Sequence, residues 1–93
     1  MTLIEFKNSL NNPTPPPAPP LLQALWHDAL GEWNKAHNLA QDMNTPDGSW
    51  IHAYLHRKEG DQSNAQYWYN RANRKMPAYS LEQEWEEIVS ELL

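Results

Sequence analysis

The chain has 93 residues, 40% of them hydrophobic, a length that allows one hydrophobic core rather than two. It has no cysteine, which excludes disulfides, thiolate metal sites and thiol nucleophiles. The net charge of −5, with seven lysine and arginine residues, argues against broad nucleic-acid binding, and no apolar run approaches the roughly 20 residues that span a bilayer. We therefore expect a cytoplasmic protein without nucleic-acid or membrane partners, folded around its five Trp and four Tyr residues.

The first 20 residues differ in composition from the rest of the chain. A short segment with apolar residues at helical spacing comes first, and six prolines follow between Pro13 and Pro20. Proline fixes φ and lacks a backbone N–H, so this stretch predicts an extended polyproline arm. We divide the chain into an N-terminal segment with a Pro-rich arm, residues 1–20, and a helical domain, residues 21–93. The arm is either a stiff connection, a ligand for a proline-binding module, or a strap over the chain's own Trp rings.

A first pair of helices is expected between the arm and the turn at residues 44–48. Apolar residues recur at helical spacing over residues 21–29, and Gly31 provides a helix end. A second apolar stripe runs from Trp33 to Met43.

A second pair of helices follows the turn. Thr45 can cap a helix whose first residue is Pro46, and this helix stops at Gly60. The next helix is expected from about residue 61 to residue 75, and Pro77 closes it.

One more helix is expected at the C-terminal end. Ser80 and Gln83 match a capping box in front of residues 81–93, which carry five glutamates and no basic residue. No stretch of the chain alternates polar and apolar residues with the period of a strand. The sequence therefore predicts an all-α fold.

Two segments of the domain repeat at a distance of 29 residues, Gly31–Ala36 and Gly60–Ala65. Each places Gly at a turn and Ala where a second helix must approach a first one. The second unit resembles the tetratricopeptide repeat superfamily through Gly60, Ala65, Tyr69, Ala72 and Pro77. Residues 65–72 also resemble the signature of its sel-one-like subclass, and residues 50–61 resemble a group of small bacterial proteins without known activity.

This resemblance implies two tetratricopeptide-like hairpins with a C-terminal cap. Two repeats need additional cover for their apolar faces, so we expect residues 81–93 to pack on the end of the second hairpin. A cap of this kind turns its glutamates to water, here Glu82, Glu84, Glu86, Glu87 and Glu91. Alternatively, the C-terminal helix joins two copies, and we expect a monomer or a weak homodimer.

The resemblance also implies a binding surface, because the first helix of each pair lines a concave groove in this superfamily. Carried over position by position, the groove residues are Trp50, Tyr54, Arg57 and Lys58. Two aromatic rings with two cations suit a peptide of acidic or aromatic character. We therefore expect a small protein-interaction module rather than an enzyme, with no cofactor. The alternative is that Trp50 and Tyr54 belong to the core, in which case no groove exists.

Histidines give a second functional hypothesis. His52 and His56 are four residues apart on a predicted helix, and Glu59 lies on the same face, so these three residues could hold a metal or a small ligand. Hydrogen-bonded histidines at a helix interface are the competing explanation. His27 and His37 are isolated in the sequence and are not expected to take part.

An enzymatic site is the remaining hypothesis. No serine lies in a nucleophile-elbow pattern, and the three glycines form no phosphate-binding loop. The rival arrangement would use His56 as a general base beside Arg57 and Asp61.

Overall fold

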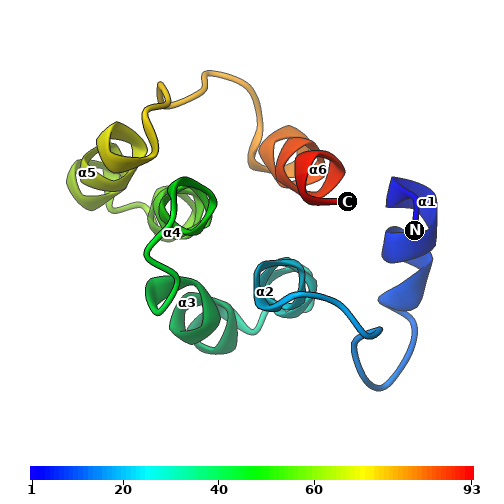
Figure 1. Cartoon of the computed structure of the whole chain (residues 1–93). Helices are drawn as coiled ribbons and strands as arrows, with labels where there is room; N and C mark the ends of the chain where they lie inside the picture. Colours follow the sequence, from blue (N-terminus) through cyan, green and yellow to red (C-terminus); the bar gives the residue numbers. More distant parts are fainter.

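The computed structural model describes all 93 residues and contains six α-helices and no strand (Figure 1). In chain order these are α1 (Leu3–Ser9), α2 (Pro20–Ala29), α3 (Trp33–Gln41), α4 (Pro46–Glu59), α5 (Gln62–Ala72) and α6 (Leu81–Leu92). The predicted all-α fold is confirmed. None of the six helices combines the length and the apolar character that crossing a bilayer requires.

Side-chain caps start four of the helices, α1, α4, α5 and α6. The Thr45 side chain accepts a hydrogen bond from the Gly48 N–H, and Pro46 is the first residue of α4, as the sequence predicts. Ser80 and Gln83 form the predicted capping box of α6, and Thr2 forms another with Glu5 at α1.

A residue in the left-handed backbone conformation follows each of α2, α4 and α5, and the sequence did not predict the one after α5. Gly31 and Gly60 have φ angles of 79° and 91°, which fits their predicted role after α2 and α4. Asn73 adopts φ 58° and ends α5 at Ala72, so the expected continuation of this helix to Lys75 is wrong. Asparagine tolerates the left-handed conformation, so the helix can stop there without glycine.

The turn between α3 and α4 depends on a glycine for a different reason. A Cβ at Gly48 would lie 2.2 Å from the carbonyl oxygen of Met43. Because α3 ends at Gln41, Met43 belongs to this turn and not to the helix, contrary to the predicted stripe. The close approach of Met43 to the first turn of α4 holds α3 next to α4.

Helices α2, α4 and α6 surround the centre of the molecule (Figure 1). Each of α2 and α4 packs against the helix that follows it, α3 also packs against α4, and α6 packs against both α2 and α4. Helix α1 lies on the outer side of α6. The expectation that α6 caps the end of the second pair is therefore incorrect, because it lies against the first helix of both pairs.

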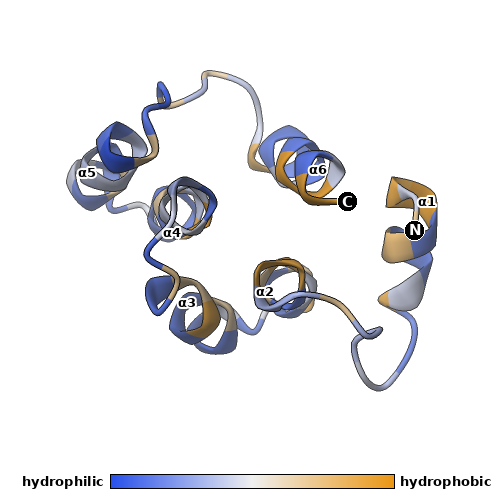
Figure 2. Ribbon diagram, in the orientation of Figure 1, coloured by the Kyte–Doolittle hydropathy of each residue, from blue (hydrophilic) through white to orange (hydrophobic).

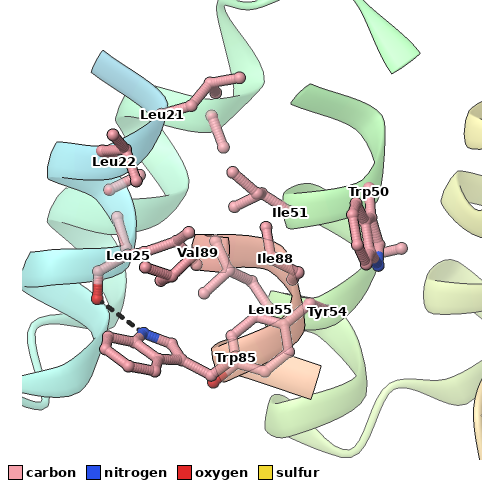
Figure 3. Close-up of a cluster of buried hydrophobic side chains, with 14 of the residues drawn as sticks. Leu21, Leu22, Leu25, Trp50, Ile51, Tyr54, Leu55, Trp85, Ile88 and Val89 are labelled. Atoms are coloured by element: carbon pink, nitrogen blue, oxygen red, sulfur yellow. Dashed lines mark hydrogen bonds between the residues drawn. The ribbon is translucent and has the colours of Figure 1, made fainter. Parts of the chain in front are cut away.

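The centre of the core is formed by the facing sides of α2, α4 and α6 (Figure 3), and Phe6 of α1, Ala36 of α3 and Tyr69 of α5 also belong to the core. Leu25, Leu55 and Ile88 are fully buried there, and the Trp85 Nε1–H donates to the Leu25 carbonyl at 2.9 Å. Figure 2 shows apolar colour on α2 and on the inner side of α6, whereas α4 carries little of it. Helix α4 is nevertheless buried continuously from Gly48 to His56. A buried helix with so many polar side chains needs internal partners for them.

Candidate functional site

Two of the four expected groove residues lie in the core. Trp50 and Tyr54 are each 2% exposed, so their rings do not line an open groove. The alternative that both rings are core residues is the one the structure shows.

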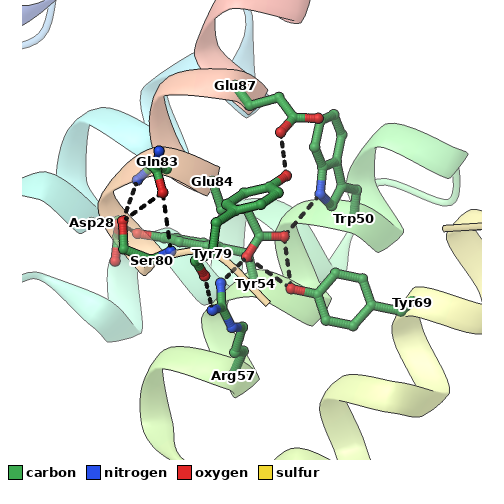
Figure 4. Close-up of polar contacts among 10 residues, drawn as sticks. All are labelled: Asp28, Trp50, Tyr54, Arg57, Tyr69, Tyr79, Ser80, Gln83, Glu84 and Glu87. Atoms are coloured by element: carbon green, nitrogen blue, oxygen red, sulfur yellow. Dashed lines mark hydrogen bonds and ion pairs between the residues drawn. The ribbon is translucent and has the colours of Figure 1, made fainter. Parts of the chain in front are cut away.

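Two of the four residues, Trp50 and Arg57, contact one buried carboxylate (Figure 4). Glu84 of α6 is fully buried. It accepts hydrogen bonds from Trp50 Nε1 at 3.1 Å, from Arg57 Nη1 at 2.8 Å and from the Tyr69 hydroxyl at 2.7 Å. The expectation that Glu84 faces water is therefore wrong, because it is the acceptor that joins α6 to α4 and α5.

A second buried carboxylate binds the remaining two expected groove residues. Asp28 of α2 is 2% exposed and accepts from the Tyr54 hydroxyl at 2.8 Å and from Lys58 Nζ at 2.9 Å. Burial and the negative charge of Asp28 raise the pKa of Tyr54, which therefore stays a hydrogen-bond donor. The four residues that the sequence assigned to an acidic peptide thus contact two carboxylates of the same chain.

Three histidines meet on the opposite face of α4. His52 and His56 come from α4, as their spacing predicts, and His37 comes from α3. One nitrogen from each ring lies within 4.8 Å of the other two, and His37 Nε2 is 2.9 Å from His52 Nε2. His52 and His56 are buried, and His37 is partly buried.

The sequence did not identify His37, although a signal for it exists. The short turn between α3 and α4 makes the two helices run back along each other. His37 lies four residues before the end of α3 and His52 six residues after the start of α4, so the two lie at similar levels of the pair. A search that pairs residues across a predicted helical turn would have placed His37 beside His52.

Aromatic rings hold two of the imidazoles from outside. Trp33 stacks on His37 with ring centroids 4.8 Å apart, and Trp68 stacks on His52 at 3.9 Å. The Trp33 Nε1–H donates to the Leu55 carbonyl at 2.9 Å, which fixes its ring. The cluster is therefore restrained before any ligand binds.

Glu59 occupies a different position from the one expected. It contacts Nδ1 of His56 at 3.0 Å and is exposed, so it lies behind His56 and not between His56 and His52. A proton on Nδ1 that is donated to Glu59 leaves Nε2 of His56 as an acceptor. Asn64 of α5 donates to that nitrogen through Nδ2 at 3.4 Å.

Glu59 also belongs to a second group of possible ligands, with His56 and Asp61 at the exposed turn after α4. Asp61 is already the cap of α5, because its Oδ1 accepts from the Asn64 backbone N–H at 3.3 Å. This second group is therefore explained by the cap and by the contact between His56 and Glu59.

Burial sets the charge of the histidine cluster. Burial, together with the neighbouring His37 and His56, lowers the pKa of His52 to about 4. Burial and His56 also lower the pKa of His37, although Glu59 opposes this shift. His52 and His37 are consequently neutral at pH 7, the state in which imidazole donates a lone pair to a cation.

The structure does not assemble the proposed general-base site. Arg57 is directed to Glu84 and to the Tyr79 carbonyl, and no side-chain hydrogen bond joins Arg57 or Asp61 to the His56 ring. His27 lies apart from the other histidines and pairs with Glu32 at 2.8 Å. Comparisons of the chain with protein-family models, with curated proteins and with solved structures found no match.

Proposed function

We propose that this protein binds one divalent transition-metal ion through His37, His52 and His56. The observation that carries the proposal is the convergence of three imidazole nitrogens from two helices within 4.8 Å. The sequence favoured a peptide-binding module, but all four residues on which that hypothesis depended make contacts within the chain. The histidine site was its alternative.

The spacing of the nitrogens fits an ion after a small adjustment. Zinc binds imidazole nitrogen at about 2.0–2.1 Å, so two nitrogens of a tetrahedral site are about 3.3 Å apart. His37 Nε2 and His52 Nε2 are 2.9 Å apart and share one proton. To bind an ion through both Nε2 atoms, the ring that carries this proton must adopt its other neutral tautomer, with the proton on Nδ1, and the two rings must separate by a few tenths of an ångström.

The donor set indicates the class of metal. Imidazole suits Zn²⁺, Cu²⁺, Ni²⁺ and Co²⁺, whereas Mg²⁺ and Ca²⁺ prefer carboxylates and carbonyls. The three grouped donors are all imidazoles, and the chain has no thiolate. The neutral state of His37 and His52 at pH 7 favours binding, because no proton must be displaced from either ring first.

The side chains around the three histidines fix the orientation of the imidazole rings. A carboxylate on the outer nitrogen of a metal-binding histidine orients the ring and raises its basicity. Glu59 makes this contact with His56, while Trp33 and Trp68 fix the planes of the other two rings.

The scaffold that we propose for this site is a pair of tetratricopeptide-like hairpins. Left-handed Gly31 and Gly60 at the turns, and buried Ala36 and Ala65 in the second helix of each pair, support this assignment. On such a scaffold the ion would connect the first hairpin, through α3, to the second, through α4.

Calorimetric titration of the full-length protein with Zn²⁺ tests the proposal. We expect one ion per chain and a loss of affinity of about 100-fold or more in His37→Gln, because one of three ligands is removed. His27→Gln is the matched control and should bind Zn²⁺ as the original protein does, since His27 lies outside the cluster. Equal affinities in the original protein and in His37→Gln, with both folded by circular dichroism, would refute the proposal.

A further inference from the structure

We propose that the ion keeps one coordination position for a small anion from solution, and that the Asn64 side chain donates a hydrogen bond to that anion. This inference rests on the proposed metal site. It follows from the number of protein ligands, from the charge they leave on the ion and from the position of Asn64.

The number of protein ligands leaves a four-coordinate ion incomplete. The group around His52 contains three donors, and the carboxylates nearby are engaged elsewhere, Glu59 with His56 Nδ1 and Asp61 with the cap of α5. Zinc sites with three protein ligands take water or another exogenous ligand in the fourth position. The fourth ligand here would therefore come from solution.

The charge of the site favours an anion in that position. Three neutral imidazoles leave the full double charge on the ion. The only nearby carboxylate that touches a ligand, Glu59, is exposed and contacts the far side of His56. An anion on the ion would neutralise part of this charge.

Asn64 is placed to recognise such an anion. Its Nδ2 lies 3.4 Å from Nε2 of His56, the nitrogen that would bind the ion. Because the Nδ1 proton is donated to Glu59, Nε2 is an acceptor, and this fixes the Asn64 amide with its N–H groups toward the site. Once an ion takes the lone pair of Nε2, these N–H groups lose their acceptor and can donate to a ligand on the ion. Asn64 and His37 are only partly buried, so this side of the cluster reaches solvent.

Azide binding to the full-length protein loaded with one equivalent of Cu²⁺ tests this inference. Azide on Cu²⁺ produces a charge-transfer band, so its binding can be followed by absorption. We expect a saturable 1:1 titration, with the copper retained by the protein on ultrafiltration. Asn64→Ala, measured with its copper site fully loaded, should weaken azide binding by about 10-fold or more, the loss of one hydrogen bond to a charged group. Asn70→Ala, on the exposed face of α5, is the matched control and should bind azide normally.

Each outcome separates this inference from the proposed function. If copper binds but no azide band appears, the protein itself fills every coordination position of the ion. If azide removes the copper from the protein, the bound ion has no coordination position for azide. Either result overturns the inference and leaves the metal site intact. Unchanged azide affinity in Asn64→Ala overturns the role of Asn64. Failure of Cu²⁺ to bind at all overturns the proposed function itself.

Discussion

Helix α4 carries two buried polar clusters on opposite faces, and their partners differ in kind. One face places Trp50 and Arg57 on the Glu84 carboxylate of α6. The other places His52 and His56 beside His37 of α3. With about 100° per residue, positions separated by four share a face, whereas positions 50 and 52 point apart.

The difference between the two clusters lies in how their polar atoms are satisfied. Glu84 has one cationic partner, Arg57, and two neutral donors, Trp50 and Tyr69, so both of its oxygens are hydrogen-bonded within the chain. In the histidine cluster, two acceptor nitrogens share a single proton between His37 and His52. A buried carboxylate with matched donors fixes the position of a helix, whereas neighbouring lone pairs without a cation form a site for one.

Removal of the Glu84 charge should have the largest effect on folding. In Glu84→Gln the Arg57 guanidinium loses its anion, and the Trp50 and Tyr69 donors lose part of their acceptor. We expect the free energy of unfolding to fall by about 3 kcal/mol, measured by urea denaturation.

Glu82→Gln is the control for this variant, because Glu82 is exposed in the first turn of the same helix. Its unfolding free energy should change by less than about 0.5 kcal/mol. If the two variants unfold alike, Glu84 does not hold α6 in place.

Zinc should stabilise the protein through the other face of α4. At a free Zn²⁺ concentration of about 100 times the dissociation constant, the unfolding free energy should rise by about 2.7 kcal/mol. Because the clusters share no partner, the same gain is expected in Glu84→Gln. Parallel urea titrations with Zn²⁺ or with a chelator measure it. A gain that disappears in Glu84→Gln would show that the two faces are coupled.

A smaller effect is expected from the carboxylate behind His56. Glu59→Ala removes the acceptor of His56 Nδ1, so the ring loses its fixed tautomer. Zn²⁺ affinity should fall by about 10-fold in a calorimetric titration, without a large change in metal-free stability. Asp47→Ala, which removes a charge from the exposed first turn of α4, should leave the affinity unchanged.

The sequence predicts more of this fold than of its site. Caps and glycine turns gave the helices, because Thr45, Gly60 and Ser80 act through local backbone bonds. The partners of a buried side chain come from other helices and leave no local pattern. The sequence predicts that Trp50 and Arg57 bind an acidic peptide. In the structure their acidic partner is Glu84 of the same chain. His37 was missed for the same reason, since its neighbour lies across a turn.

The weakest expected effect concerns acid stability of the metal-free protein. Burial, with His37 and His56 nearby, lowers the pKa of His52 to about 4, below its ordinary value of about 6.5. The unfolded chain therefore binds a proton on His52 between these two values, while the folded protein does not. Stability contributed by His52 is fully present above pH 6.5 and is lost as the pH falls toward 4. We expect a loss of about 1 kcal/mol between pH 7 and about pH 5.7 in urea titrations with chelator.

His52→Gln isolates this contribution, because it removes the titrating ring while keeping a polar side chain at the same position. The original protein should lose more stability than this variant over the same pH range, and the His52 imidazole resonance should titrate near pH 4 in NMR spectra. Titration near its ordinary pKa would mean that water reaches the ring. Stacking by Trp68 and burial at 6% exposure argue against this, because both keep solvent from the charged form. The same exclusion of water leaves the lone pairs of the cluster available to an ion at neutral pH.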